Sequence, residues 1–221
     1  MQTYYARRAA EYENIFDKPE RQADLARLRA DLPALFEGER VLEIACGTGY
    51  WTPLIAARAE SVHAIDYADE TLAIAKSKRY ARANVGFERA DAYSLPVWPQ
   101  KFSACFAGFW WSHVPLAKLD AFLEGLHQRL APGARVAFLD NLYVEGSSTP
   151  VSRRDAEGNT YQQRRLADGS GHEVLKNFPT AQEMQERLAR RGTDVRFSSY
   201  EYYWVATYRI MAGTTSGGGT Q

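Results

Sequence analysis

The chain has 221 residues, of which 45% are apolar and 24% charged, proportions typical of a globular domain with a substantial core. Its 27 basic and 27 acidic side chains give a formal net charge of zero, so no general basic field is present to attract nucleic acid. Two cysteines are too few for a disulfide framework or a zinc site, and we find neither a secretory signal nor an apolar run of membrane-spanning length. We therefore expect a cytoplasmic domain with no nucleic-acid or membrane partner.

Two helices are predicted at the start of the chain. Residues 3–16 carry aromatic side chains at helical spacing, and residues 20–36 carry leucines at helical spacing after Pro19 at a start position. We expect residues 1–36 to form a helical cap. The sequence leaves open whether each tyrosine of this region packs on the domain or faces a ligand.

Residues 40–52 predict a strand, a glycine turn and a helix, the first unit of a doubly wound α/β sheet. Gly47 and Gly49 permit positive φ or a close approach of the backbone to a ligand. Glu43 lies at the end of this strand, where a carboxylate disfavours a pyrophosphate and favours a ligand with a cationic amino group. The unit therefore favours a ligand with a cationic amino group over a pyrophosphate.

Acidic residues end the next two predicted strands as well. Asp66 closes the strand at 62–66, roughly twenty residues past the glycine turn, where an acid reaches the ribose of an adenosine-type ligand. We expect Asp69 to cap the following helix, which leaves Asp66 for the ligand. Asp91 follows a third strand that begins at Val85. Glu43, Asp66 and Asp91 thus end three successive strands.

The fourth predicted strand, 103–108, leads into an aromatic segment. Phe109, Trp110 and Trp111 follow the strand, and His113 comes two residues later. A leucine-striped helix is expected over 116–130, followed by a fifth strand over 135–140. The leucines are core residues to which we assign no chemistry.

Residues 141–178 exceed what a minimal α/β domain needs, and we expect a lid or interface element there. Alternation around Asp168-Gly169 predicts a β-hairpin. Its arginines are candidates for gripping a carboxylate or phosphate, although nearby acids favour a solvated face; they are Arg153, Arg154, Arg164 and Arg165.

A capping box at 180–183 opens a final helix, and two alternating strands follow at 194–200 and 203–210. We expect one domain over 1–212 and a mobile, nonessential tail over 213–221, which is rich in Gly, Ser and Thr.

The string Glu43-x-Ala45-Cys46-Gly47-Thr48-Gly49 resembles the glycine-rich motif [DE]-x-[GA]-x-G-x-G of class I S-adenosylmethionine-dependent methyltransferases, with Ala45 in place of the first glycine. The resemblance covers residues 38–140 by motif and includes the leucine-x-proline-glycine turn at 130–133. It implies a doubly wound, mostly parallel seven-stranded Rossmann-like sheet with a C-terminal antiparallel hairpin, to which this chain adds an inserted β-hairpin.

The resemblance also implies S-adenosylmethionine as cofactor, S-adenosylhomocysteine as product and a small-molecule methyl acceptor. In this family, acids at these positions hold the amino-acid end, the ribose and the adenine. The residues placed at the cofactor are Tyr12, Glu43, Ala45, Cys46, Gly47, Gly49, Trp51, Thr52, Asp66, Tyr67, Asp91, Ala92 and Phe109. Those placed at the acceptor are Tyr4, Trp110, Trp111, Asn141 and Tyr143. His113 and Tyr5 are the candidate general bases, with a loop-fixing role favoured for His113.

Three other functions are compatible with parts of this pattern. A nicotinamide-dependent oxidoreductase would share the first unit, but Glu43, Asp91 and the absent third glycine argue against it. A nucleic-acid or protein methyltransferase would keep the cofactor site, and so would a non-catalytic S-adenosylmethionine-binding protein. The sequence shows no metal-ligand spacing, and it leaves open the acceptor, the atom methylated (O or N, with C not excluded) and the choice between monomer and homodimer.

Overall fold

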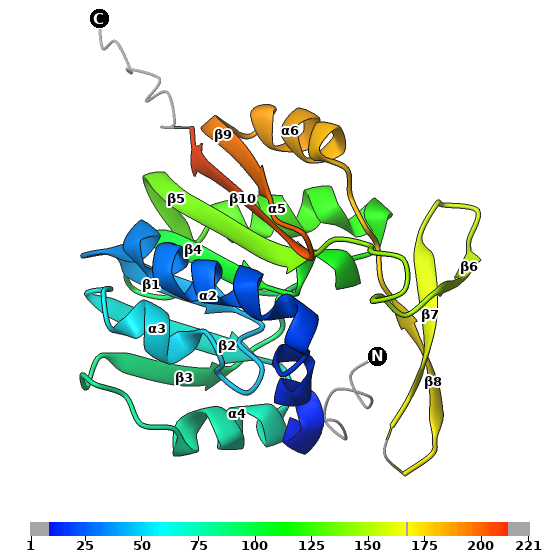
Figure 1. The fold of residues 1–221 in the computed structure, drawn as a ribbon. Helices are drawn as coiled ribbons and strands as arrows, with labels where there is room; N and C mark the ends of the chain where they lie inside the picture. The colour runs from blue at the N-terminus through cyan, green and yellow to red at the C-terminus, as the bar shows by residue number, and fades with distance from the viewer. Residues whose placement is uncertain (1–8, 167, 212–221) are drawn as a thin grey trace, which may run out of the picture.

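The structure is a computed structural model that describes residues 9–166 and 168–211 (Figure 1). Its main sheet has seven strands in the order β3-β2-β1-β4-β5-β10-β9. The strands are β1 (Arg40–Ile44), β2 (Ser61–Asp66), β3 (Val85–Arg89), β4 (Phe102–Gly108), β5 (Leu130–Asn141), β9 (Gly192–Ser199) and β10 (Tyr203–Ile210). Strands β1 to β5 pair in parallel, whereas β10 pairs antiparallel with both β5 and β9. The predicted fold class is confirmed.

Helices cover both faces of this sheet, and each face has its own apolar core (Figure 1). The helices α2 (Gln22–Asp31), α3 (Thr52–Ala56) and α4 (Asp69–Ser77) bury their apolar side chains in one core. The helices α5 (Leu119–His127) and α6 (Ala181–Ala189) bury theirs in the other. Within the described residues there are also five short 3-10 helices: η1 (Ala9–Phe16), η2 (Pro19–Arg21), η3 (Leu32–Phe36), η4 (Trp111–His113) and η5 (Leu116–Lys118).

Two predicted helices differ from the structure in their bounds and regularity. The helix expected over 20–36 is divided, and α2 ends at Asp31 because Pro33 has no N–H to continue the ladder and restricts the residue before it. The helix expected over 116–130 starts with the 3-10 turn η5 and ends at His127. The capping box is present as predicted, with Thr180 Oγ1 accepting from the N–H of Glu183.

A second, three-stranded antiparallel sheet stands beside the carboxyl ends of the parallel strands (Figure 1). Its strands are β6 (Val151–Arg154), β7 (Thr160–Arg165) and β8 (Gly171–Leu175), so the predicted hairpin β7–β8 gains β6 as a third member. All four side chains of β6 are exposed, so the strand has no apolar alternation to reveal it.

Two buried asparagines fasten this small sheet to the main domain. The Asn159 side chain accepts from the N–H of Leu116, and the Asn177 side chain donates to the carbonyl of Val114. The backbone N–H of Asn177 donates to the carbonyl of Ser112. These hydrogen bonds all reach one segment, η4 and the residues after it.

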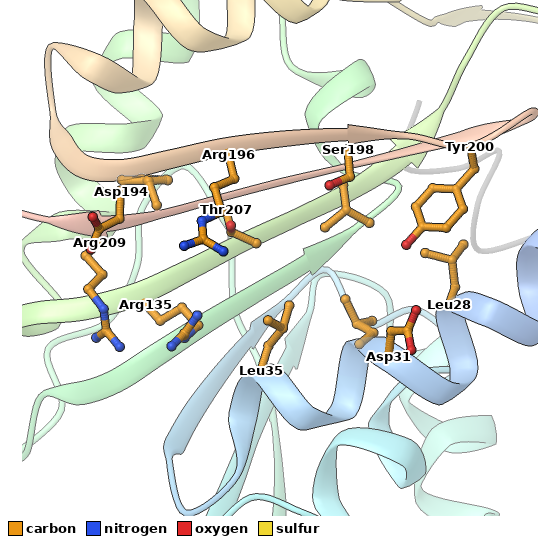
Figure 2. A pocket seen from close by; sticks show the side chains of 13 residues that line it. Leu28, Asp31, Leu35, Arg135, Asp194, Arg196, Ser198, Tyr200, Thr207 and Arg209 are labelled. Atoms are coloured by element: carbon orange, nitrogen blue, oxygen red, sulfur yellow. The ribbon is translucent and has the colours of Figure 1, made fainter.

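On the face that carries α2, the sheet beyond β5 borders an open cleft of about 510 Å³ (Figure 2). Arg135, Arg196 and Arg209 project into it from the strands, opposite Leu28 and Leu35 of the helical layer. None of the described residues lining this cleft lines the cavities at the strand ends described below. Across the described ranges, no helix is long and apolar enough to cross a membrane, and no cluster of His, Cys, Asp or Glu is suited to a metal ion.

Candidate active site

A cavity of about 140 Å³, here called the strand-end cavity, lies where β1, β2, β3 and β4 end. Its lining residues are Tyr12, Ala45, Gly47, Asp66, Tyr67, Ala68, Thr71, Ala90, Asp91, Ala92, Tyr93, Gly108, Phe109, Trp110 and His113. Most of this surface is apolar, with acids on the two neighbouring strand ends. The shape and polarity suit a flat ligand with hydrogen-bonding groups at its periphery.

The glycine turn after β1 forms one wall of this cavity. Gly47 has a φ of 58°, and a Cβ there would have only Tyr12 within 4 Å, at 3.9 Å, so the backbone is open to a ligand. Ala45 adopts a φ of 52°, a left-handed conformation that costs free energy and is found preferentially at binding sites. Gly49 serves packing instead, because a Cβ there would lie 2.9 Å from the Cβ of Ala75.

Asp66 ties the turn to the following helix and still lines the cavity. One carboxylate oxygen accepts from the N–H of Gly47 at 2.8 Å, and the other accepts from the N–H of Ala68 and the hydroxyl of Thr71, both at 3.0 Å. The expectation that Asp69 caps this helix is wrong: the N-cap is Ala68, and Asp69 pairs with Arg89. Asp66 therefore links the glycine turn to the start of α4, and its oxygens retain room for one further donor.

Asp91 presents a less occupied carboxylate. Its Oδ1 accepts from the N–H of Tyr93 at 2.9 Å, while Oδ2 has no hydrogen-bond partner within the described ranges. Beside it, the Tyr93 ring packs on Trp110 with 5.3 Å between ring centroids. Burial is the main cause that raises the pKa of Tyr93 to about 12, so its hydroxyl stays protonated near neutral pH.

Five residues predicted at the cofactor lie beneath the cavity surface instead of lining it. They are Glu43, Cys46, Gly49, Trp51 and Thr52. Glu43 is 2% exposed, and its Oε2 has no hydrogen-bond partner in the part of the chain that the structure describes. Burial raises the pKa of Glu43 to about 8, so the carboxyl group holds a proton at neutral pH.

The segment after β4 reaches both this cavity and its neighbour. Phe109 has a φ of 57°, and its N–H donates to the carbonyl of Leu139 at 2.7 Å. His113 hydrogen-bonds through Nδ1 to the carbonyl of Leu175 at 2.7 Å, and burial lowers its pKa well below the ordinary value. This contact supports the loop-fixing role. Trp111 is directed elsewhere and packs on Phe138 in the core.

A second cavity of about 300 Å³, the basic cavity, shares Tyr12, Phe109 and His113 with the first. Its charged lining residues are all cationic within the described ranges: Lys18, Arg21, Arg164, Arg165 and Lys176. Asn141 lines it as predicted, whereas Tyr143 lies in a separate cleft with Trp111 and packs on Phe178.

Arg21 is the most informative member of this lining. Its side chain is 7% exposed and donates to Asn141 Oδ1 at 3.0 Å and to Ser147 Oγ at 3.1 Å. No carboxylate of the described residues forms an ion pair with it, and its buried Nε has no hydrogen-bond partner there. A buried guanidinium without an ion-pair partner is costly, so an anionic ligand in this cavity would be stabilised.

Comparison with known proteins decides the family. A methyltransferase-domain family model matches residues 41–133. A solved complex of DhpI with SAM and HEP is 32% identical, covers 93% of this chain and 94% of its own, and superposes with a TM-score of 0.75. A DhpI complex with SAH is 30% identical over 95% of each chain, with a TM-score of 0.74. The chain belongs to the class I S-adenosylmethionine-dependent methyltransferases.

Curated relatives of this methyltransferase match over a shorter stretch. The 2-phytyl-1,4-naphtoquinone methyltransferase of Thermosynechococcus vestitus is 30% identical over 125 residues, 55% of each chain. A demethylmenaquinone methyltransferase of Staphylococcus epidermidis is 30% identical over 107 residues, 44% of its own length. The chain thus spans about half the length of the curated relatives it matches.

The residues present fit the family's cofactor, S-adenosylmethionine. The open backbone at Gly47, the spare capacity of Asp66 and the unpaired Oδ2 of Asp91 supply acceptors and space around an apolar slot. These are features that an adenosine with a cationic amino-acid tail would satisfy.

The sequence-based predictions agree with the structure for cavity-lining residues that lie next to a motif in the sequence. They differ for lining residues that lie far from any motif. Tyr4 and Tyr5, predicted at the acceptor and as a base, lie outside the described residues. Missed members of the strand-end cavity, such as Thr71 and Tyr93, lie a few residues past a predicted strand end and were within reach of the motif argument. Arg21 and Lys176 gave no sequence signal, because each is a single basic residue with no recognisable motif around it.

Proposed function

We propose that this methyltransferase transfers the methyl group of S-adenosylmethionine to an oxygen atom of a small anionic acceptor. The strand-end cavity would hold the cofactor, and the adjoining basic cavity would hold the acceptor. The observation that carries the proposal is Arg21, a buried guanidinium that has no carboxylate partner among the described residues and lines the basic cavity. The DhpI complex, which contains SAM together with HEP, supports a small-molecule acceptor.

The shared lining of the two cavities gives the geometry for transfer. S-adenosylmethionine, when bound, supplies an activated methyl group on a cationic sulfur. Phe109 and His113 line both cavities, so donor and acceptor would meet beside them. The chain's own contribution is to orient the acceptor and to exclude water, because the methyl group needs no further activation.

An oxyanion acceptor accounts for the lack of an efficient base. No carboxylate belongs to the described lining of the basic cavity, and His113 is a weak base because its pKa is lowered. A neutral hydroxyl acceptor would need a group to remove its proton. A carboxylate, phosphate or phosphonate oxygen has already lost its proton at neutral pH and needs none.

A panel of matched acceptors tests this function. The enzyme would be incubated with S-adenosylmethionine and pairs of small molecules that differ only in charge, such as an acid and its amide, together with the DhpI ligand HEP. Mass spectrometry would detect products that have gained a methyl group, and fragmentation would locate it. We expect methyl esters of anionic members and no product from their neutral partners.

Two results would refute the proposal. One is methylation of neutral members at rates equal to their anionic partners. The other is methylation confined to nitrogen or carbon. Binding of S-adenosylhomocysteine, measured by calorimetry in the same preparation, shows that the protein is folded, so that a lack of activity is not due to unfolding.

A further inference from the structure

Lys176 is a fully enclosed ammonium at the junction of the two sheets. It follows β8 directly, its side chain is 4% exposed, and its Nζ donates to Asp140 Oδ1 at 2.7 Å and to Ser112 Oγ at 2.6 Å. Asp140, in β5, is 0% exposed. A buried lysine is rare without a strong reason, and this one lines the basic cavity.

The ammonium has one more N–H than its partners use. A lysine carries three donors, and the hydrogen bonds to Asp140 and Ser112 account for two. No third acceptor is found in the part of the chain that the structure describes. A buried donor without a partner costs free energy, and an acceptor atom in the cavity that Lys176 lines would remove that cost.

Asp140 holds Lys176 in place and is itself fully engaged. Its Oδ1 also accepts from the backbone N–H of Asn141 at 2.8 Å, and its Oδ2 accepts from the N–H of Ser112 at 3.0 Å. The Asn141 amide donates to Asp140 and accepts from Arg21, so one chain of hydrogen bonds joins Lys176 to Arg21 across the cavity. The two cations are thereby fixed relative to each other.

The charges around Lys176 also favour an anion. Burial, with the cations Arg164 and Arg21 adding to it, lowers the pKa of Lys176, and the attraction of Asp140 opposes that shift. The remaining titratable neighbour is His113, whose pKa is lowered so that it stays neutral near pH 7. An anion beside this group would oppose the loss of the lysine's proton.

We propose that Lys176 donates its third N–H to an oxygen of the acceptor's anionic group, so that it is the acceptor-orienting residue of the basic cavity. This inference rests on the proposed function for the identity of its ligand. Asp140 acts through Lys176 as a positioning residue. The inserted sheet β6–β8 would then place one cation, Lys176, at the acceptor site.

Calorimetry with the enzyme saturated in S-adenosylhomocysteine tests the inference, with inorganic phosphate and acetate as probes. We expect Lys176→Met to weaken phosphate binding at least tenfold while the affinity for S-adenosylhomocysteine stays unchanged. Lys176→Arg keeps a donor and a charge and should restore part of the binding. Lys101→Met removes the same charge from an exposed position outside the basic cavity and should have no effect.

Removing Lys176 alone leaves the buried Asp140 carboxylate without a cationic partner, so the variant pair Asp140→Asn and Asp140→Asn/Lys176→Met provides a second comparison. The double variant should bind phosphate more weakly than Asp140→Asn alone. In the wild type, phosphate binding should weaken as the pH rises through the lowered pKa of Lys176, and Lys176→Arg should show no such decline over that range.

The outcomes separate the two proposals. Absence of phosphate binding to the wild type, or equal binding by Lys176→Met, overturns the role of Lys176. If Lys176→Met also methylates anionic acceptors with an unchanged KM, the proposed function survives without Lys176. If phosphate binding depends on Lys176 but no anionic acceptor is methylated, the anion site stands and the proposed function falls.

Discussion

The strand-end cavity and the basic cavity are adjacent but built in different ways. The strand-end cavity is made almost entirely from residues that follow successive parallel strands, and its charged side chains are acids. The basic cavity takes its cations from the N-terminal segment and the inserted sheet, regions that lie far apart in the sequence. The strand-end cavity is thus formed by the common fold, whereas the basic cavity is formed by the segments that this chain adds to the fold.

This difference implies that donor and acceptor binding are separable. Only Tyr12, Phe109 and His113 belong to both linings, and each presents an aromatic or neutral ring near physiological pH. The charged groups are divided cleanly between the cavities. Variants of these charges should therefore affect one ligand and spare the other.

The largest effect is expected for Arg21→Gln. Loss of a buried cation that meets an anionic ligand costs about 2–5 kcal/mol, which corresponds to roughly a 30- to 5000-fold rise in KM for the acceptor. The affinity for S-adenosylhomocysteine should not change. Steady-state kinetics measures the KM for the acceptor, and calorimetry measures the affinity for S-adenosylhomocysteine. Arg153→Gln, which removes an exposed arginine paired with Glu173, is the matched control. An equal loss of both affinities would contradict the separation.

A smaller effect, on stability, is expected at Glu43. Its folded-state pKa of about 8 exceeds the ordinary 4.5, so the folded form holds a proton that the unfolded form releases. Stability should therefore decline as the pH rises from about 4.5 to about 8. Glu43→Gln removes this decline, and at pH 8.5 the ligand-free variant should exceed the wild type by roughly 2–4 kcal/mol in urea unfolding. Parallel pH profiles for the two proteins would refute the assignment.

Asp66→Ala should weaken binding of S-adenosylhomocysteine and leave anion binding unchanged, the reverse of what we expect for Arg21→Gln. Loss of a charged acceptor at the turn costs about 1.5–3 kcal/mol, so the Kd for S-adenosylhomocysteine should rise roughly 10- to 100-fold. Phosphate binding to the basic cavity, measured without cofactor, should be unaltered. Asp69→Ala, which removes an exposed acid three residues away, serves as control and should leave both affinities within error.

The smallest effect is expected at His113, which touches both cavities. Asn at this position can still donate to the carbonyl of Leu175, so His113→Asn should retain kcat within about tenfold, whereas loss of a general base costs about 100-fold or more. The pH profile of kcat should show no inflection near 6.5 from this residue, because its pKa is lowered well below that value. A 100-fold loss in His113→Asn would restore the base hypothesis.

The sequence was informative where structure is local. The left-handed glycine turn, the acid that ends β2 and the acid just past β3 all follow from patterns confined to a few residues each. The division of the helix over 20–36 was also within reach, because Pro33 marks it. Local chemistry and the pairing rules of parallel sheets suffice for such features.

The basic cavity was beyond that kind of reasoning. Arg21, Asn141 and Lys176 meet through contacts between residues 36 to 120 positions apart, and nothing near any of them in the sequence signals its partners. The role of Glu43 was similarly hidden, because burial beneath the turn, and not its position at a strand end, determines its protonation. Side chains that are far apart in the sequence and meet only in the folded chain can be recognised as one site only from the three-dimensional structure.

The attachment of β6–β8 by Asn159 and Asn177 has a consequence for how acceptor preference can change. An uninterrupted stretch of chain provides the three strands, and its anchors are hydrogen bonds whose partners are mainly backbone groups. Such a stretch can be exchanged as a unit: a related enzyme's version that keeps the two asparagines and a cation for Asp140 at position 176 would fit the same place. Swapping it would alter the contour offered to the acceptor, while Arg21 on the opposite wall would keep the demand for a negative charge.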